Sequence, residues 1–134
     1  MKKLLVLLVF SLMNLVSFSA MKDGIYYVEK SYDNEWKSFV KITVKNDKII
    51  GAQYDRKNSE GVLLSLDQKE NDEAKAKYGS SFREMSFLLT RGLVSVQNVE
   101  PNVTVKDSSS FDEFTKMVDY LIENANSGED EVYK

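Results

Sequence analysis

The 134-residue sequence contains no cysteine and no histidine, and these absences exclude several kinds of chemistry. Without cysteine the chain forms no disulfide, and it lacks the lipid-modified cysteine that tethers many exported bacterial proteins. Serine–histidine triads, cysteine nucleophiles, zinc sites and histidine-ligated haem each need one of the two missing residue types. The fold must therefore be held together by packing, and most familiar hydrolase mechanisms are excluded.

The first residues follow the order of a secretory signal sequence. Two lysines precede an apolar stretch from Leu4 to Val16, and small or polar residues follow up to Ala20. We predict a signal peptide over residues 1–20, with cleavage after Ser19 slightly preferred to cleavage after Ala20. An uncleaved membrane anchor is the alternative, but a bilayer span needs roughly 20 apolar residues. We therefore expect an extracytoplasmic protein, periplasmic, secreted or associated with the cell envelope, with no stable membrane span after cleavage.

The exported part of the chain is acidic. Without the two signal lysines, 16 basic residues remain against 21 acidic ones, so the net charge is about minus five. Nucleic acid is therefore excluded as a partner. Four acidic residues cluster in mid-chain without the alternating spacing and glycine of a calcium loop, namely Asp67, Glu70, Asp72 and Glu73. We interpret them as a solvated helix face and predict no metal site.

Three strands are predicted in the first half of the mature chain. Segment 24–30 is rich in β-branched and aromatic residues, and segment 36–45 alternates apolar with polar residues, as a half-buried strand does. The turn-prone pair Asn46 and Asp47 separates it from a further strand over 48–54. Two such runs on either side of a two-residue turn predict an antiparallel hairpin.

Helices are predicted in the second half, after a polar loop from residue 56 to 61. We expect three of them, over 66–77, from 82 to about 97, and from the serine run at 108–110 onward. Ser81 with Glu84 fits a capping box, and so does Ser110 with Glu113. The last helix carries an apolar stripe that faces the core, formed by Phe111, Phe114, Val118, Leu121, Ile122 and Ala125.

Strands first and helices later indicate an α+β fold, a small antiparallel sheet with helices packed on one face. Pro101 breaks the chain between the last two helices, and segment 103–105 is a candidate for a short further strand. We predict one domain over 21–126 and an acidic, disordered tail over 127–134, which begins where the polar run after Ala125 sets in.

Segments 23–26 (DGIY) and 40–49 (VKITVKNDKI) resemble the opening of exported FMN-binding domains. Those domains begin with a D-G-x-Y strand and an I-T-V-x-D-G-K-I hairpin, and the likeness extends over essentially the whole mature chain. The resemblance implies an FMN-binding-domain fold. It also implies a flavin, held near the last helix, that exchanges electrons with an envelope redox partner.

The signature of that family, S/T-G-A-T, lies just before the final helix, and its last threonine can carry FMN through a phosphoester bond. Segment 102–110 (NVTVKDSSS) stands opposite it, with Lys106 and Asp107 in place of the glycine and alanine. The resemblance implies that Ser108 is the attachment or phosphate-facing hydroxyl. Lys106, Ser109 and Ser110 would then steady the phosphate, while Trp36 or Tyr54 approaches the flavin ring.

Each of these residues also has a structural interpretation. The serines can simply cap a helix, and the aromatic residues can belong to the core or to the hairpin. Asp107 would repel a phosphate, whereas Lys106 and the free amides of a helix N-terminus would attract one.

Three functions follow as hypotheses. The first is an exported flavin carrier in envelope electron transfer, which is not an enzyme in itself because the flavin performs the chemistry. The second is a degenerate member that has lost flavin and binds another small anion or a protein. The third is an envelope-associated structural protein.

Overall fold

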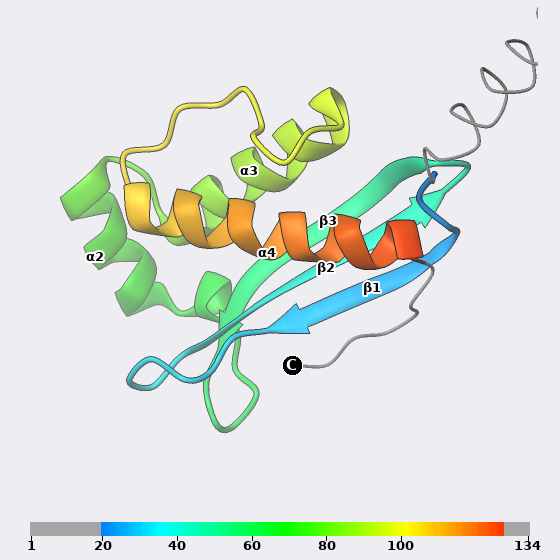
Figure 1. The fold of residues 1–134 in the computed structure, drawn as a ribbon. Coiled ribbons are helices and arrows are strands. Elements are labelled where there is room, and N and C mark those ends of the chain that lie inside the picture. Colours follow the sequence, from blue (N-terminus) through cyan, green and yellow to red (C-terminus); the bar gives the residue numbers. More distant parts are fainter. Residues whose placement is uncertain (1–19, 128–134) are drawn as a thin grey trace, which may run out of the picture.

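The computed structural model describes residues 20–127, so the predicted signal cleavage and acidic tail, apart from Ala20 and Ser127, lie outside the described residues. Three strands and three α-helices form an α+β fold, which confirms the predicted class (Figure 1). The elements are β1 (Gly24–Glu29), β2 (Lys37–Lys45), β3 (Lys48–Lys57), the 3-10 turn η1 (Leu64–Leu66), α2 (Gln68–Tyr78), α3 (Phe82–Val96) and α4 (Ser108–Ser127).

The sheet is antiparallel, with the order β1-β2-β3. Its central hairpin turns at Asn46 and Asp47, whose φ angles are 52° and 60°. Positive φ at both positions matches the right-handed twist of the flanking strands, and Asn and Asp tolerate this conformation better than most residues. The predicted hairpin is confirmed.

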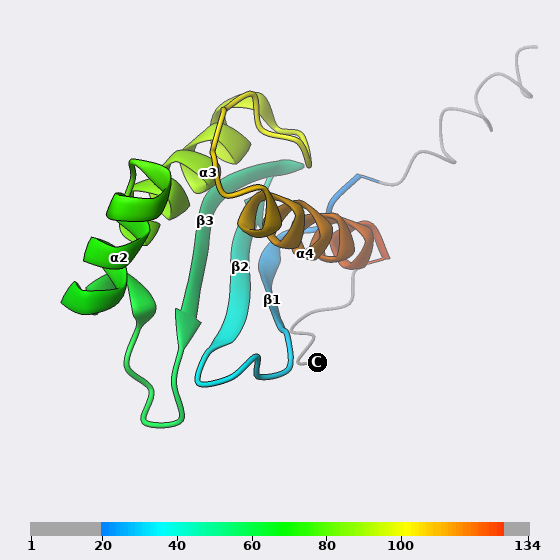
Figure 2. The same cartoon turned by 90° about the vertical axis from the view of Figure 1, so that its left-hand side faces the viewer.

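All three helices lie on the same side of the sheet (Figures 1 and 2). Alternate residues of each strand point toward them and are buried, including Tyr26, Val28, Val40, Ile42, Val44, Ile49 and Tyr54. Helix α3 packs on β3, and α4 packs across β1 and β2. Four of the six residues of the predicted α4 stripe, Phe114, Val118, Leu121 and Ala125, are fully buried, while Phe111 and Ile122 are partly buried and pack against the core. Burial of each large side chain contributes about 1.5–3 kcal/mol to folding.

The helix boundaries follow from local capping. The side chain of Asp67 accepts a hydrogen bond from the amide of Glu70, so α2 begins after Asp67, whereas we predicted a start at Leu66. Gly79 ends α2 with φ of 78°, a conformation that glycine adopts without strain. The capping box predicted for Ser81 and Glu84 at the start of α3 is confirmed.

The predicted short strand at 103–105 is wrong, because this segment forms neither strand nor helix. It packs instead against Gly92 of α3, where a Cβ atom would lie 2.9 Å from Cβ of Pro101 and 3.0 Å from Cγ1 of Val103. The absence of a side chain at Gly92 therefore lets the connection cross the helix closely. At the other end of the chain, α4 extends to Ser127, the first residue of the predicted tail.

Strand β3 extends three residues beyond the predicted end at Tyr54. The additional residues, Asp55 to Lys57, are polar, and we interpreted Arg56 and Lys57 as part of a loop. In the structure each of them has a partner elsewhere, so their polar groups are satisfied within a strand. Arg56 places its side chain on the helix-covered face, where it contacts polar side chains of α4.

Candidate functional site

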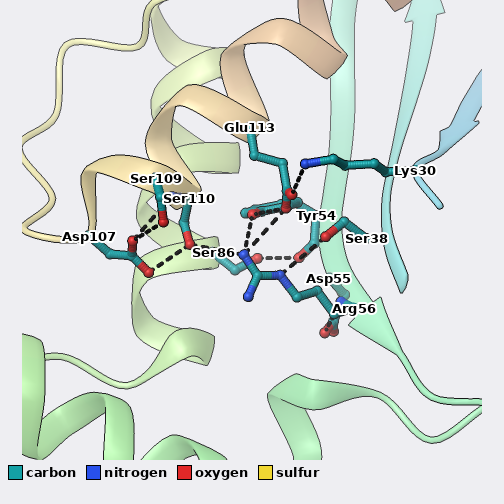
Figure 3. A network of polar contacts seen from close by, with 10 residues as sticks. All are labelled: Lys30, Ser38, Tyr54, Asp55, Arg56, Ser86, Asp107, Ser109, Ser110 and Glu113. Atoms are coloured by element: carbon teal, nitrogen blue, oxygen red, sulfur yellow. Dashed lines mark hydrogen bonds and ion pairs between the residues drawn. The ribbon is translucent and has the colours of Figure 1, made fainter. Parts of the chain in front are cut away.

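The first turn of α4 is organised by the carboxylate of Asp107 (Figure 3). Asp107 Oδ1 accepts hydrogen bonds from the amide of Ser110 at 3.1 Å and from the hydroxyl of Ser109 at 2.9 Å. Its Oδ2 accepts from the hydroxyl of Ser110 at 2.6 Å. Asp107 therefore caps the helix, and the capping box predicted for Ser110 and Glu113 is wrong.

Glu113 turns instead toward the sheet, where its carboxylate binds two cations and a phenol. Oε1 accepts from the hydroxyl of Tyr54 at 2.8 Å and lies 3.3 Å from Nη2 of Arg56, while Oε2 lies 3.2 Å from Nζ of Lys30. These contacts tie α4 to the end of β1 and to β3. Figure 3 shows the carboxylate between Lys30 and Arg56.

The guanidinium of Arg56 joins the two groups. Its Nη2 donates to the hydroxyl of Ser110 at 3.1 Å, and its Nε donates to the hydroxyl of Ser38 at 3.2 Å. Arg56 also lies over the ring of Phe82, 5.2 Å from the ring centre. One cation thereby links β2, β3 and the start of both α3 and α4.

The protonation states agree with this arrangement. Burial raises the pKa of Glu113, but hydrogen bonds from Ser38 and Tyr54 and the charge of Arg56 outweigh it, so the pKa is lowered. Burial likewise raises the pKa of Asp107, and the hydrogen bonds from Ser110 and Ser109 reverse the effect to a lowered pKa. The pKa of the Tyr54 hydroxyl is raised, mainly by burial. At neutral pH both carboxylates are therefore charged and the phenol is protonated.

The structure places the predicted site residues in different surroundings. Ser110 is fully buried, whereas Lys106, Ser108 and Ser109 are exposed. Trp36 is partly buried and packs against the core, immediately before β2. The structure thus brings Lys106 and the serines to one helix start, while Trp36 packs against the core.

A pocket of about 240 Å³ adjoins this helix start. It lies between the α2–α3 junction and the segment before α4, and its lining includes Tyr78, Phe82, Met85, Val105, Lys106 and Asp107. This volume is below the roughly 300 Å³ at which ordinary ligand pockets begin.

A larger cleft, of about 840 Å³, opens between β3, η1, α2 and α3. On its β3 side, the carboxylate of Asp55 accepts hydrogen bonds from the amide and the hydroxyl of Ser65, and the hydroxyl of Ser86 donates to the carbonyl of Tyr54. Two apolar side chains line it while largely exposed to solvent, Leu66 at 68% and Phe87 at 62%.

Sequence reasoning missed this cleft. Its charged lining residues come from three separate elements and carry both signs, so no single sequence segment predicts them; they are Asp55, Asp72, Lys75, Arg83 and Glu84. The available signal was a pair of apolar residues outside the core stripes, Leu66 and Phe87.

An FMN phosphate does not fit the donors at the start of α4. Three of the groups that would hold it, the amide of Ser110 and the hydroxyls of Ser109 and Ser110, already bind the carboxylate of Asp107, whereas the side chains of Lys106 and Ser108 are exposed. Asp107 is ionised, so an added phosphate would meet a like charge a few ångströms away.

Between residues 20 and 127, no group of three or more acidic side chains is arranged to hold a metal ion. Within the same range, no helix has the length and apolar character to cross a bilayer.

Comparisons with known proteins give one curated relative and two solved structures. The chain is 30% identical over 130 residues to a 15 kDa lipoprotein of Treponema pallidum, which covers 90% of this chain and 87% of the relative. A crystal structure of a Clostridium perfringens protein is 28% identical with a TM-score of 0.78, over 84% of this chain and 95% of that one.

An NMR structure of a Clostridium thermocellum protein has a TM-score of 0.50 at 22% identity, over 78% of this chain and 92% of that one, and it supports the fold alone. No protein-family model matches the sequence.

Proposed function

The chain belongs to the same family as the 15 kDa lipoprotein of Treponema pallidum, and from that premise we propose that it is an extracytoplasmic binding module of the cell envelope. The predicted signal sequence and the relative's name both support a location at the envelope. Because the sequence contains no cysteine, this chain would not be anchored through a lipidated cysteine.

The observation that carries the proposal is the carboxylate of Asp107 at the start of α4. It occupies the amide of Ser110 and the hydroxyls of Ser109 and Ser110, three of the donors that a flavin phosphate would need, and its charge would repel the phosphate. We infer that this domain keeps the fold and carries no flavin at Ser108.

We propose the cleft beside β3 as the binding site, in place of a flavin site at Ser108. At about 840 Å³ it falls within the range of small-molecule sites, and it combines exposed apolar groups with charges of both signs. Leu66 and Phe87 would contact an apolar part of the ligand, while Arg83 and Lys75 would contact an anionic part. Because three carboxylates line the cleft beside these two cations, the arrangement suits a small amphipathic ligand that carries charges of both signs.

Flavin loading distinguishes the proposed binding module from a flavin carrier. The protein is exported in a host that has a flavin-transferring enzyme, denatured, and inspected for flavin fluorescence that migrates with the chain. We expect none, and we expect no change in FMN fluorescence when the folded protein is titrated. A fluorescent band would establish the flavin carrier and contradict our proposal.

A triple variant separates loss of the signature from loss of the whole pocket. Lys106→Gly, Asp107→Ala and Ser108→Thr restore the family's small residues and its threonine. Flavin uptake by this variant would show that only the signature has changed. No uptake by a folded variant would show that the remaining surface no longer accepts the cofactor.

The cleft is tested by native mass spectrometry of the exported protein. We expect a retained small molecule, which is lost in the double variant Leu66→Ala, Phe87→Ala. The matched control is Ile50→Ala, Val96→Ala, which removes two apolar residues that are 55% and 45% exposed and do not line the cleft. Equal loss in both variants, or no retained molecule, would contradict the cleft as the binding site.

A further inference from the structure

Five lysines lie on the sheet face that points away from the helices. Lys37, Lys41 and Lys45 alternate with the buried residues of β2, so their side chains share the opposite face. The register pairs Lys37 with Lys57 and Lys45 with Lys48, which places the β3 lysines on the same face. We call this surface the lysine face.

The lysine face is basic in a domain that is otherwise acidic. Its five lysines stand against two carboxylates, Glu29 and Asp55, which leaves a charge of about plus three. Residues 20–127 contain 15 basic and 18 acidic residues, a net charge of minus three, so the remaining surface carries about minus six. The lysine face is therefore opposite in sign to the rest of the described domain taken together.

The carboxylates next to the lysine face are engaged with other groups. Asp55 is only 4% exposed and accepts hydrogen bonds from Ser65. At the hairpin end, Asp23 accepts from the amide of Asn46, and Asp47 accepts from the amide of Met21. These groups face backbone donors at the edge and do not pair with the neighbouring lysines through any contact observed in residues 20–127.

Two of the lysines have a structural role. Lys37 and Lys57 lie 2.7 Å and 2.6 Å from the carboxylate of Glu29, and Lys57 covers the stacked rings of Tyr27 and Phe39 at 5.7 Å and 5.4 Å. The other three, Lys41, Lys45 and Lys48, are exposed. They supply positive charge to solvent without stabilising the sheet through an ion pair among the described residues.

We propose that the lysine face docks on the anionic surface of a membrane. The inference rests on the proposed envelope location, and its argument is charge complementarity. The curated relative is a lipoprotein, whereas this chain has no cysteine to acylate, so a basic surface would supply the membrane contact by another route. Ile25, which is 51% exposed at the β1 edge of the face, adds an apolar contact.

The expected strength follows from the three exposed lysines. Each lysine near an anionic lipid surface improves binding roughly fivefold, so three of them together contribute about a hundredfold. Such binding weakens as salt screens the charges. A neutral lipid surface offers no comparable attraction.

The test is co-sedimentation of the exported protein with phosphatidylcholine vesicles, with and without phosphatidylglycerol. The variant Lys41→Gln, Lys45→Gln, Lys48→Gln is compared with Lys69→Gln, Lys77→Gln, Lys116→Gln, which removes the same charge from exposed positions on α2 and α4. Mass spectrometry establishes that all samples share one N-terminus, and circular dichroism establishes that they are folded.

We expect the unmodified protein and the helix variant to bind only the anionic vesicles, and the sheet variant to bind them about a hundredfold more weakly. Equal binding by the two variants, or equal binding to neutral vesicles, would overturn the proposal. Binding to a soluble polyanion such as heparin without binding to vesicles would overturn it as well. The cleft and flavin experiments change residues outside the lysine face. A negative result in those experiments is therefore distinguishable from a negative result in the vesicle experiment.

Discussion

The carboxylate of Glu113 on α4 lies 3.3 Å from the guanidinium of Arg56 on β3, and this ion pair ties the last helix to the edge strand of the sheet. The two residues are 57 positions apart in the sequence. The pair is partly buried, with 12% of the Glu113 side chain and 27% of the Arg56 side chain exposed. Removing one partner of such a pair leaves the other without compensation.

We predict that Glu113→Gln lowers the free energy of unfolding by about 2 kcal/mol, less than the 3–5 kcal/mol of fully buried pairs because Arg56 keeps some contact with water. Urea denaturation followed by circular dichroism measures the change. Glu123→Gln, an exposed position on the same helix, is the control and should have little effect. Equal stability of the two variants would show that the ion pair does not hold α4 in place.

A second prediction concerns acid stability. Burial of Glu29 opposes ionisation, but hydrogen bonds from Lys37 and Lys57 prevail and lower its pKa from 4.5 to about 2. A carboxyl group with a lowered pKa stabilises the fold above its unfolded value and loses this contribution as the pH falls through the folded value. The loss for Glu29 therefore occurs as the pH falls from about 4.5 to 2.

Denaturation midpoints across this range should fall steeply for the unmodified protein and less steeply for Glu29→Gln. Glu113 has a lowered pKa as well, so some slope will remain in the variant. Parallel curves for the two proteins would mean that Glu29 titrates as it does in the unfolded chain.

The third prediction tests the close crossing at Gly92. Alanine is more favourable than glycine in a helix interior by up to about 1 kcal/mol. A Gly→Ala change would therefore stabilise the protein if the space beside the residue were open. Here the added Cβ would meet Pro101 at 2.9 Å and Val103 at 3.0 Å. We expect Gly92→Ala to destabilise the protein by about 1–3 kcal/mol, as overpacking does.

The control for Gly92→Ala is Ser95→Ala, an exposed position on the same helix. It should leave the thermal midpoint unchanged or raise it slightly. If Gly92→Ala also raised the midpoint, the connection at 101–103 would have to be more loosely packed than the structure places it.

Features determined by neighbouring residues could be predicted from the sequence. The turn at Asn46 and Asp47 and the capping box of Ser81 and Glu84 each depend on residues at most three positions apart, and the structure contains both. The buried faces of the strands followed from the alternation of apolar residues, which is equally local.

Features determined by distant partners could not be predicted. Strand β3 continues through three polar residues because Asp55, Arg56 and Lys57 meet Ser65, Glu113 and Glu29. These contacts span 10, 57 and 28 positions, and no short sequence pattern encodes them.

The same limit applies to the candidate site. Asp107 and Ser110 are both good N-cap residues, and the sequence alone does not rank them. The structure assigns the cap to Asp107 because Ser110 is fully buried and accepts a hydrogen bond from Arg56. The position of Lys106 and the serines at the helix start followed from the sequence, whereas their binding role stays a prediction.

The last prediction concerns this cap. Asp107→Ala removes the acceptor for the amide of Ser110 and for two hydroxyls, so we expect a loss of about 1–2 kcal/mol in the free energy of unfolding. Asp107→Asn keeps an acceptor without the charge, and it should recover part of the loss. Ser109→Ala removes only an exposed hydroxyl and should cost much less. If Ser109→Ala were as harmful as Asp107→Ala, then the hydroxyl of Ser109, and not the carboxylate of Asp107 alone, would hold the first turn of α4.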